Sequence, residues 1–129
     1  FLLSLVLKIG QKLGRVKKLV QGTLSKIPSG KRVIGFGASA KASVLLNYCG
    51  IGPGAIEYIV DANPIKQGYA IPGVRIPIFP EEEMLSRPPD YVVNFIWNLK
   101  ADVLTKLRKF APGAILITLF PDPLFEKVG

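Results

Sequence analysis

The stretch that decides the fold runs from Val33 to Ile51 and reads VIGFGASAKASVLLNYCGI. It starts with apolar residues, passes through a run of small residues, and ends with apolar residues at helical spacing. This order predicts a β-strand over 32–36, a tight glycine-containing turn, and an α-helix over 39–49. Together they form the first unit of an alternating strand and helix pattern.

The rest of the chain repeats that alternation. Further strands are expected at 55–61, 74–79, 91–96 and 113–120, and further helices at 80–85 and 98–110. Such alternation predicts a parallel sheet with helices on both faces. We therefore expect an α/β fold, a Rossmann-like three-layer unit over residues 31–129 with a mostly parallel five-stranded sheet in the order 3-2-1-4-5. Asn98 is expected to be the N-cap of the last helix.

Residues 1–27 predict a long helix in front of this unit. Its apolar residues recur every three or four positions, at Leu2, Val6, Ile9, Leu13, Val16, Val20, Leu24 and Ile27. A helix that packs on a core has this pattern, and so does a helix that docks on a partner or a membrane surface. We expect residues 1–129 to form one domain. Because the chain begins with Phe1 rather than Met, we expect a fragment or a processed form.

The charge is distributed unevenly along the chain. The formal net charge is +8, and residues 1–56 hold nine Lys or Arg and no acid, whereas residues 57–129 hold eight bases and nine acids. A one-signed field of this kind attracts anions such as phosphates, acidic protein surfaces, nucleic acid or lipid headgroups. Nucleic acid is not expected as a partner, because no aromatic residues are interleaved with the Lys and Arg residues and no nucleic-acid recognition motif is present.

Composition excludes several classes of chemistry. The chain has one cysteine, Cys49, and no histidine. An internal disulfide, a thiolate or imidazole metal site, and catalysis by a serine or cysteine paired with histidine are therefore excluded. We expect no catalytic residue and no metal ligand. The apolar segment before Lys8 is too short for a membrane span and for a signal-peptide core. We expect a cytoplasmic protein, and a membrane is not the partner that we favour.

The turn after the first strand carries a glycine pattern. Gly35, Gly37 and Ala40 form G-x-G-x-x-A, a variant of the dinucleotide-binding fingerprint. Asp61 lies 24 residues after Gly37, where an acid that binds a ribose is expected. A Rossmann-like unit also needs a tight turn there without any ligand, so both interpretations stay open. Lys41 places a cation against the helix dipole, which indicates either a bound anion or a solvated side chain on the rim.

Four ordered segments carry a resemblance to a known family. They read GFGASAKAS, LLNYCGIG, VDANPIKQGYAIPGVRIPI and IWNLKADV. In this order they resemble the C-terminal domain of SAM-dependent sugar C-methyltransferases, which act on deoxysugars carried on a nucleotide diphosphate. The resemblance extends from the second half of the first helix to the last strand. Ser39 and Ala42 depart from it, because the family has Pro and Gly there.

The resemblance implies a domain that binds a nucleotide-diphosphate sugar and is not catalytic alone. S-adenosylmethionine would be the cofactor of the full-length enzyme, held by a SAM-binding domain in cis or in a partner chain, and no cofactor is expected on this chain. The resemblance places Gly37, Ala38, Ser39 and Lys41 near the substrate phosphates or sugar. It places Asn47, Asp61, Lys66 and Gln67 on the same edge, and the glycine pattern adds Gly35 to these substrate-binding candidates.

Two other functions stay open from the residues. The segment from Ile56 to Ile78 also resembles Rossmann modules of sugar-modifying enzymes, in which the ligand would be NAD or coenzyme A. Alternatively, the chain is a non-enzymatic module that docks on a partner or a membrane surface through its basic N-terminal helix.

Overall fold

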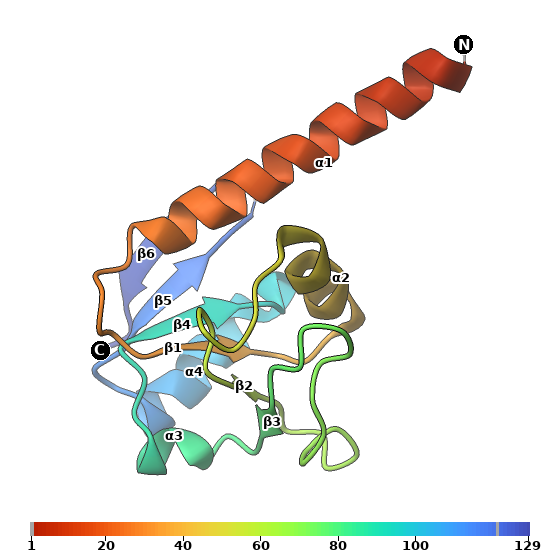
Figure 1. The fold of residues 1–129 in the computed structure, drawn as a ribbon. Helices are drawn as coiled ribbons and strands as arrows, with labels where there is room; N and C mark the ends of the chain where they lie inside the picture. The colour runs from red at the N-terminus through yellow and green to blue at the C-terminus, as the bar shows by residue number, and fades with distance from the viewer. Residues whose placement is uncertain (1, 121) are drawn as a thin grey trace.

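The structure, a computed structural model, describes residues 2–120 and 122–129, without the side chains of residues 5, 6 and 8–10. The helices are α1 (Leu2–Ser25), α2 (Ala40–Cys49), α3 (Glu83–Ser86) and α4 (Lys100–Phe110), with a 3-10 turn η1 (Trp97–Leu99) before α4. The strands are β1 (Val33–Phe36), β2 (Ile59–Val60), β3 (Ile78–Phe79), β4 (Tyr91–Asn94), β5 (Ile115–Thr118) and β6 (Leu124–Lys127). Figure 1 shows α1 projecting from a sheet that has helices on both sides.

The strands form one sheet in the order β3-β2-β1-β4-β5-β6, and β1 to β5 run parallel. The predicted α/β class and the order of the first five strands are confirmed. The prediction of five strands is wrong, because β6 pairs antiparallel with β5. Pro121 and Pro123 directly precede β6, and prolines usually argue against a strand. They are tolerated beside an edge strand, which is the position of β6.

Two predicted strands are much shorter in the structure. The predicted strand over 55–61 is reduced to Ile59–Val60, because the amides of Ala55 and Ile56 both donate to Gly52 O in a turn. The predicted strand over 74–79 is reduced to Ile78–Phe79. The residues before β3 instead form a reversal, closed by a bridge between Ala70 and Pro77.

The prediction that Asn98 is a helix N-cap is wrong. After β4 the chain enters η1, and α4 begins at Lys100 with Leu99 as its N-cap residue. In this described segment no side chain caps α4. The amide of Ile96 donates to Asn94 Oδ1, 2.9 Å away. This bond turns the chain directly after the strand, and η1 delays the start of the helix.

Alternating strand residues divide the core into two layers. On one face, α1 and α2 pack on the sheet through Val20, Leu46 and Cys49, which meet strand residues such as Val93 and Ile117. On the other face, α3 and α4 contribute the buried side chains Met84, Val103 and Leu107. The parallel strands β1 to β5 are therefore covered on both faces, whereas β6 at the edge is largely exposed.

Helix α1 is only partly covered by the domain. Val20 is buried, and Val16 and Leu24 are partly buried against the core. The N-terminal part of α1 extends beyond the sheet (Figure 1). Across residues 2–120 and 122–129, no helix combines the length and the hydropathy needed to cross a bilayer.

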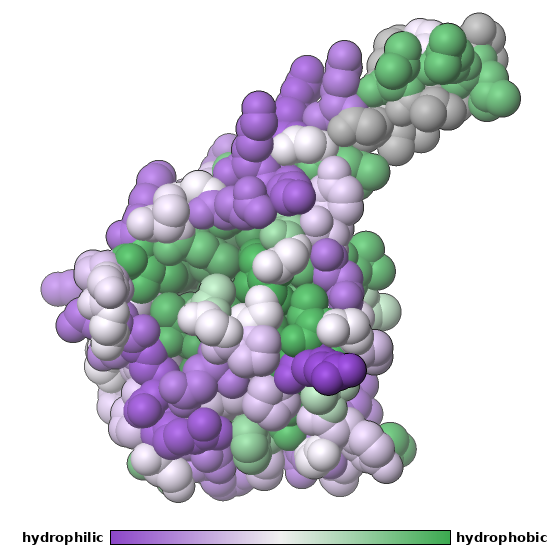
Figure 2. All heavy atoms as spheres, in the orientation of Figure 1, coloured by the Kyte–Doolittle hydropathy of each residue, from purple (hydrophilic) through white to green (hydrophobic). Residues whose placement is uncertain are grey.

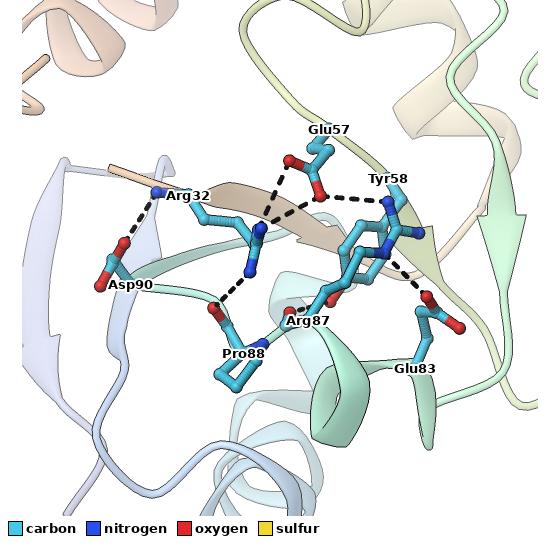
Figure 3. Close-up of polar contacts among 7 residues, drawn as sticks. All are labelled: Arg32, Glu57, Tyr58, Glu83, Arg87, Pro88 and Asp90. Atoms are coloured by element: carbon cyan, nitrogen blue, oxygen red, sulfur yellow. Dashed lines mark hydrogen bonds and ion pairs between the residues drawn. The ribbon is translucent and has the colours of Figure 1, made fainter. Parts of the chain in front are cut away.

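Ion pairs join the amino ends of the strands (Figure 3). The Arg32 and Arg87 side chains both pair with Glu57, at 3.2 Å and 3.1 Å. Arg87 also pairs with Glu83, with 2.8 Å between Nε and Oε2. The amide of Arg32 donates to Asp90 Oδ2 at 2.8 Å. These contacts connect the starts of β1, β2 and β4 with the end of α3.

The buried ring of Tyr58 lies beneath this cluster. The guanidinium of Arg87 lies 4.4 Å from the Tyr58 ring centroid and 4.9 Å from that of Phe79. The Tyr58 hydroxyl donates to the carbonyl of Arg87, 2.7 Å away. Arg87 therefore combines two ion pairs with two aromatic contacts, and its backbone accepts the hydrogen bond of the ring beneath it.

We predict that Arg87→Ala destabilises the domain by about 1–3 kcal/mol, because it removes both ion pairs and both cation–π contacts at a partly buried position. Urea unfolding followed by circular dichroism measures the change. Arg108→Ala is the matched control, because Arg108 is exposed on α4. Equal stability of the two variants would contradict this role of Arg87.

A second prediction concerns alkaline pH. Burial raises the pKa of Tyr58 from 10.0 to about 12, although the charge of Arg87 opposes the shift. The folded state thus holds its proton more tightly than the unfolded state. The free energy of unfolding is then unaffected by this group below pH 10 and decreases as the pH rises from 10 to 12.

Tyr58→Phe should reduce the loss of stability between pH 10 and pH 12, while costing about 1 kcal/mol at neutral pH for the lost hydrogen bond. Unfolding curves across this range test it. Tyr69→Phe serves as the control, because Tyr69 is exposed. If the free energy of unfolding decreases equally for Tyr58→Phe and the wild type, Tyr58 does not cause the loss of stability at alkaline pH.

Candidate functional site

The candidate site lies at the carboxyl ends of β1 and β2. There the turn between β1 and α2 faces the long connection between β2 and β3. Open parallel sheets bind ligands at this edge. A groove of about 570 Å³ lies between these segments, and we call it the carboxyl-edge groove. Its lining residues are Ala38, Ser39, Ala40, Ser43, Val44, Ile65, Lys66, Tyr69, Ala70, Ile71, Pro72 and Ile78.

Both glycines of the fingerprint are required by packing within the domain. Gly37 has φ +97°, and a Cβ there would lie 2.7 Å from Ile96 Cγ2. At Gly35 a Cβ would lie 2.7 Å from Phe95 Cε2 and 2.9 Å from Ile59 Cγ1. These close approaches come from the protein's own side chains. The glycine pattern is therefore explained by the fold, and evidence for a ligand has to come from other residues.

Asp61 joins the two segments that form the groove. Its Oδ2 accepts the amide of Ala38 at 2.8 Å, and its Oδ1 accepts the amide of Asn63 at 2.9 Å. Gln67 Nε2 donates to the backbone carbonyl of Asp61 at 2.8 Å. Each carboxylate oxygen thus receives a backbone hydrogen bond from the protein. Asp61 and Gln67 therefore hold the two segments together, and a role for Asp61 in binding a ribose stays a prediction.

Lys66 is the charged residue of the groove. Its Nζ donates to the carbonyl of Ala38, 2.8 Å away, which holds the partly buried side chain across the groove. An ammonium group has three N–H donors, so two remain after this bond. Among the described residues that line the groove, Lys66 alone carries a charge. A bound anion would therefore meet this ammonium group.

Ser39 and Ser43 contribute hydroxyl groups from the start of α2. Ser39 is the N-cap, and its Oγ accepts the amide of Ala42 at 3.1 Å. Both side chains are partly buried and line the groove. A hydroxyl that accepts one hydrogen bond still has its own proton to donate. The groove thus combines one cation with hydroxyl groups, close to the positive end of the α2 dipole.

Lys41 lies on the other side of α2. Its Nζ is 5.7 Å from the centroid of the Trp97 ring. There it borders a second hollow, the apolar cleft, lined by Leu13, Val16, Ala40, Lys41, Val44, Leu45, Tyr48, Trp97 and Phe120. The cation–π contact offsets the unfavourable helix dipole. A role for Lys41 in phosphate binding stays a prediction.

Asn47 does not line the groove, but its side chain holds the wall formed by Pro72. Its Nδ2 donates to Pro72 O and to Ser43 O, each at 2.8 Å. Gly73 has φ +85°, and a Cβ there would overlap Asn47 Oδ1. The amide therefore anchors the Pro72–Gly73 turn on α2. The structure brings together Ala38, Ser39 and Lys66 as lining residues and places Asn47 behind the wall.

The sequence prediction did not include Ser43, Ile65 and Tyr69 among the site residues. Ile65 and Tyr69 are exposed at the groove, on the connection between β2 and β3. Tyr69 could have been found from its position next to Gly68 in the polar loop, but nothing local indicates which way the ring points. The position of Tyr69 depends on the chain reversal that is closed by the bridge between Ala70 and Pro77.

The titratable side chains that line the groove are those of Lys66 and Tyr69. No carboxylate occurs among its described lining residues, and the chain has no histidine. In the described residues no group of three His, Cys, Asp or Glu is placed to hold a metal ion. Burial raises the pKa of the Cys49 thiol, although the charge of Lys17 acts in the opposite direction. The raised pKa disfavours a nucleophilic thiolate.

Comparison with known proteins gives one consistent result. A sequence model of the family described as "C-methyltransferase C-terminal domain" matches residues 5–121. The C-methyltransferase NovU of Streptomyces niveus is 34% identical over 110 residues, which are 84% of this chain. The match spans only 26% of that relative's length.

We predict that Asp61→Asn destabilises the domain by about 1–3 kcal/mol, because an amide has one acceptor oxygen for the two backbone N–H groups. The amides of Ala38 and Asn63 should exchange hydrogen faster, as followed by NMR. Asp122→Asn is the control, because Asp122 is exposed. Unchanged protection of both amides would show that Asp61 does not hold the loops together.

Proposed function

The chain belongs to the family of C-methyltransferase C-terminal domains, and from that premise we propose that it holds the substrate of a SAM-dependent methyltransferase. The proposed substrate is a deoxysugar on a nucleotide diphosphate, bound in the carboxyl-edge groove. Methyl transfer itself is assigned to a SAM-binding domain, in cis or in a partner chain. SAM supplies the methyl group there, and this chain supplies binding and orientation.

The observation that carries the proposal is the position of Lys66. A diphosphate has negative charge and several acceptor oxygens, and an ammonium group with two N–H donors left is suited to it. The hydrogen bond to the Ala38 carbonyl fixes this ammonium before any ligand arrives. The nearby start of α2 adds the positive end of a helix dipole.

The rest of the groove is suited to a deoxysugar. Its lining combines apolar side chains such as Ile65 and Pro72 with the hydroxyl groups of Ser43 and Tyr69. A deoxysugar has the same mixture, because some ring carbons carry hydroxyls and others only hydrogen or methyl. A few fixed polar groups in an apolar groove are typical of sites that orient a small ligand.

The proposal also accounts for the missing acid–base chemistry. Forming a carbon–carbon bond at a sugar carbon requires a base to remove a proton from that carbon. Neither a carboxylate nor an imidazole occurs among the described residues of the groove. The base is therefore expected on the SAM-binding domain. NAD and coenzyme A stay alternative ligands of this edge of the sheet, and the titration below distinguishes them from the sugar nucleotide.

The test is calorimetric titration of the chain with a dTDP-deoxysugar, and separately with SAM, NAD and coenzyme A. We expect saturable binding of the sugar nucleotide. Lys66→Met should weaken that binding about tenfold or more, because a charge-assisted hydrogen bond contributes about 1.5–3 kcal/mol. Binding of SAM without binding of the sugar nucleotide would overturn the proposal.

Two variants complete this test. Lys31→Met removes an exposed cation outside the groove and should leave the affinity unchanged. Lys41→Ala should have a smaller effect than Lys66→Met, because Lys41 faces Trp97 in the apolar cleft. Melting curves of each variant separate a loss of binding from a loss of folding.

A further inference from the structure

The apolar cleft is a second hollow with a different character. It lies between α1 and α2, has a volume of about 620 Å³, and is lined by apolar and aromatic side chains with Lys41 at its rim. Leu13 and Tyr48, on its two helical walls, are 43% and 40% exposed. The lining of the carboxyl-edge groove includes a cation and hydroxyl groups, whereas the lining of this cleft is almost entirely apolar. A small polar ligand would gain little there.

The exposed apolar surface continues along α1. Leu2, Leu3 and Leu7 are 71%, 72% and 58% exposed. At 100° per residue, Leu2 and Leu13 lie on one side of the helix, whereas Leu3 and Leu7 lie roughly 100–140° away. Apolar atoms are visible beneath α1 and at its far end (Figure 2). A helix that is apolar on several sides needs more cover than one sheet provides.

Basic residues flank this apolar surface. Lys12 and Lys17 are exposed on α1, each one helical turn from a residue of the cleft, and Lys17 Nζ lies 6.0 Å from the Tyr48 ring centroid. The sequence has no acid before Glu57 to neutralise them. A complementary partner surface therefore has an apolar centre and an acidic rim.

Charge and shape distinguish between possible occupants. A second copy packed through α1 would bring two sets of like charges together, which is unfavourable. A bilayer surface could take up the far end of α1, but it does not fill a concave cleft walled by α2 and Phe120. A folded protein with a convex apolar ridge and acidic flanks satisfies both conditions.

We propose that the apolar cleft and the exposed face of α1 dock the SAM-binding part of the methyltransferase. This inference rests on the proposed function. About three quarters of the relative NovU lies outside the match, so the family provides a large neighbouring polypeptide. Ala40 and Val44 line both the cleft and the carboxyl-edge groove. A partner seated in the cleft would therefore border the substrate groove across one turn of α2.

The experiment measures binding of the chain to the part of NovU that lies outside the match, purified separately, by biolayer interferometry. We expect Leu13→Glu and Tyr48→Glu each to weaken binding about tenfold or more, because each places a charge in the apolar contact. Leu85→Glu is the control, because Leu85 is exposed on α3. Hydrogen exchange should show new protection in residues 2–16 and 40–48 of the complex.

Four outcomes would overturn the proposal. They are no complex with the wild-type chain, equal affinity of the cleft variants and the wild type, self-association that Leu13→Glu abolishes, and sedimentation with phosphatidylserine vesicles that Leu13→Glu abolishes. Neither cleft variant lies in the carboxyl-edge groove, so both should bind the sugar nucleotide as the wild type does. Loss of docking and loss of substrate binding are therefore separate results.

Discussion

The carboxylate of Asp61 is the interaction on which the candidate site depends. It accepts the amide of Ala38 on one side and the amide of Asn63 on the other, so the turn after β1 and the connection after β2 have one fixed separation. Lys66 crosses between the same two segments, and its Nζ donates to the Ala38 carbonyl. The groove, with Lys66 as its charged lining residue, lies between the two segments that Asp61 joins. Asp61 occupies the expected position of a ribose-binding acid, yet here it organises the loops.

The two edges of the sheet are built differently. At the amino edge, Arg87 connects Glu57, Glu83 and two aromatic rings, and the charged groups are paired with one another. At the carboxyl edge, hydroxyl groups and the Lys66 ammonium retain hydrogen-bonding capacity. The ion-pair cluster and the groove proposed to bind the substrate thus lie at opposite ends of the same strands.

Helix α2 has a central position in the proposed function. One of its sides lines the carboxyl-edge groove and another lines the apolar cleft, with Ala40 and Val44 shared between them. The fold therefore places a polar surface for a small ligand next to an apolar surface suited to a protein. In the proposed function, the methyl-transfer chemistry is assigned to such a neighbour.

The sequence by itself determined the α/β class, the order of the five parallel strands and the family, because these depend on periodicity and on motifs that are local in the chain. It also named three of the residues that line the groove, Ala38, Ser39 and Lys66. Only the tertiary structure decided their roles. The directions of Lys41 and Lys66, the anchoring by Asn47 and the pairing of β6 depend on contacts between residues far apart in the chain. A local pattern shows that a residue lies near an edge, but the neighbours that pack against it decide which hollow it faces.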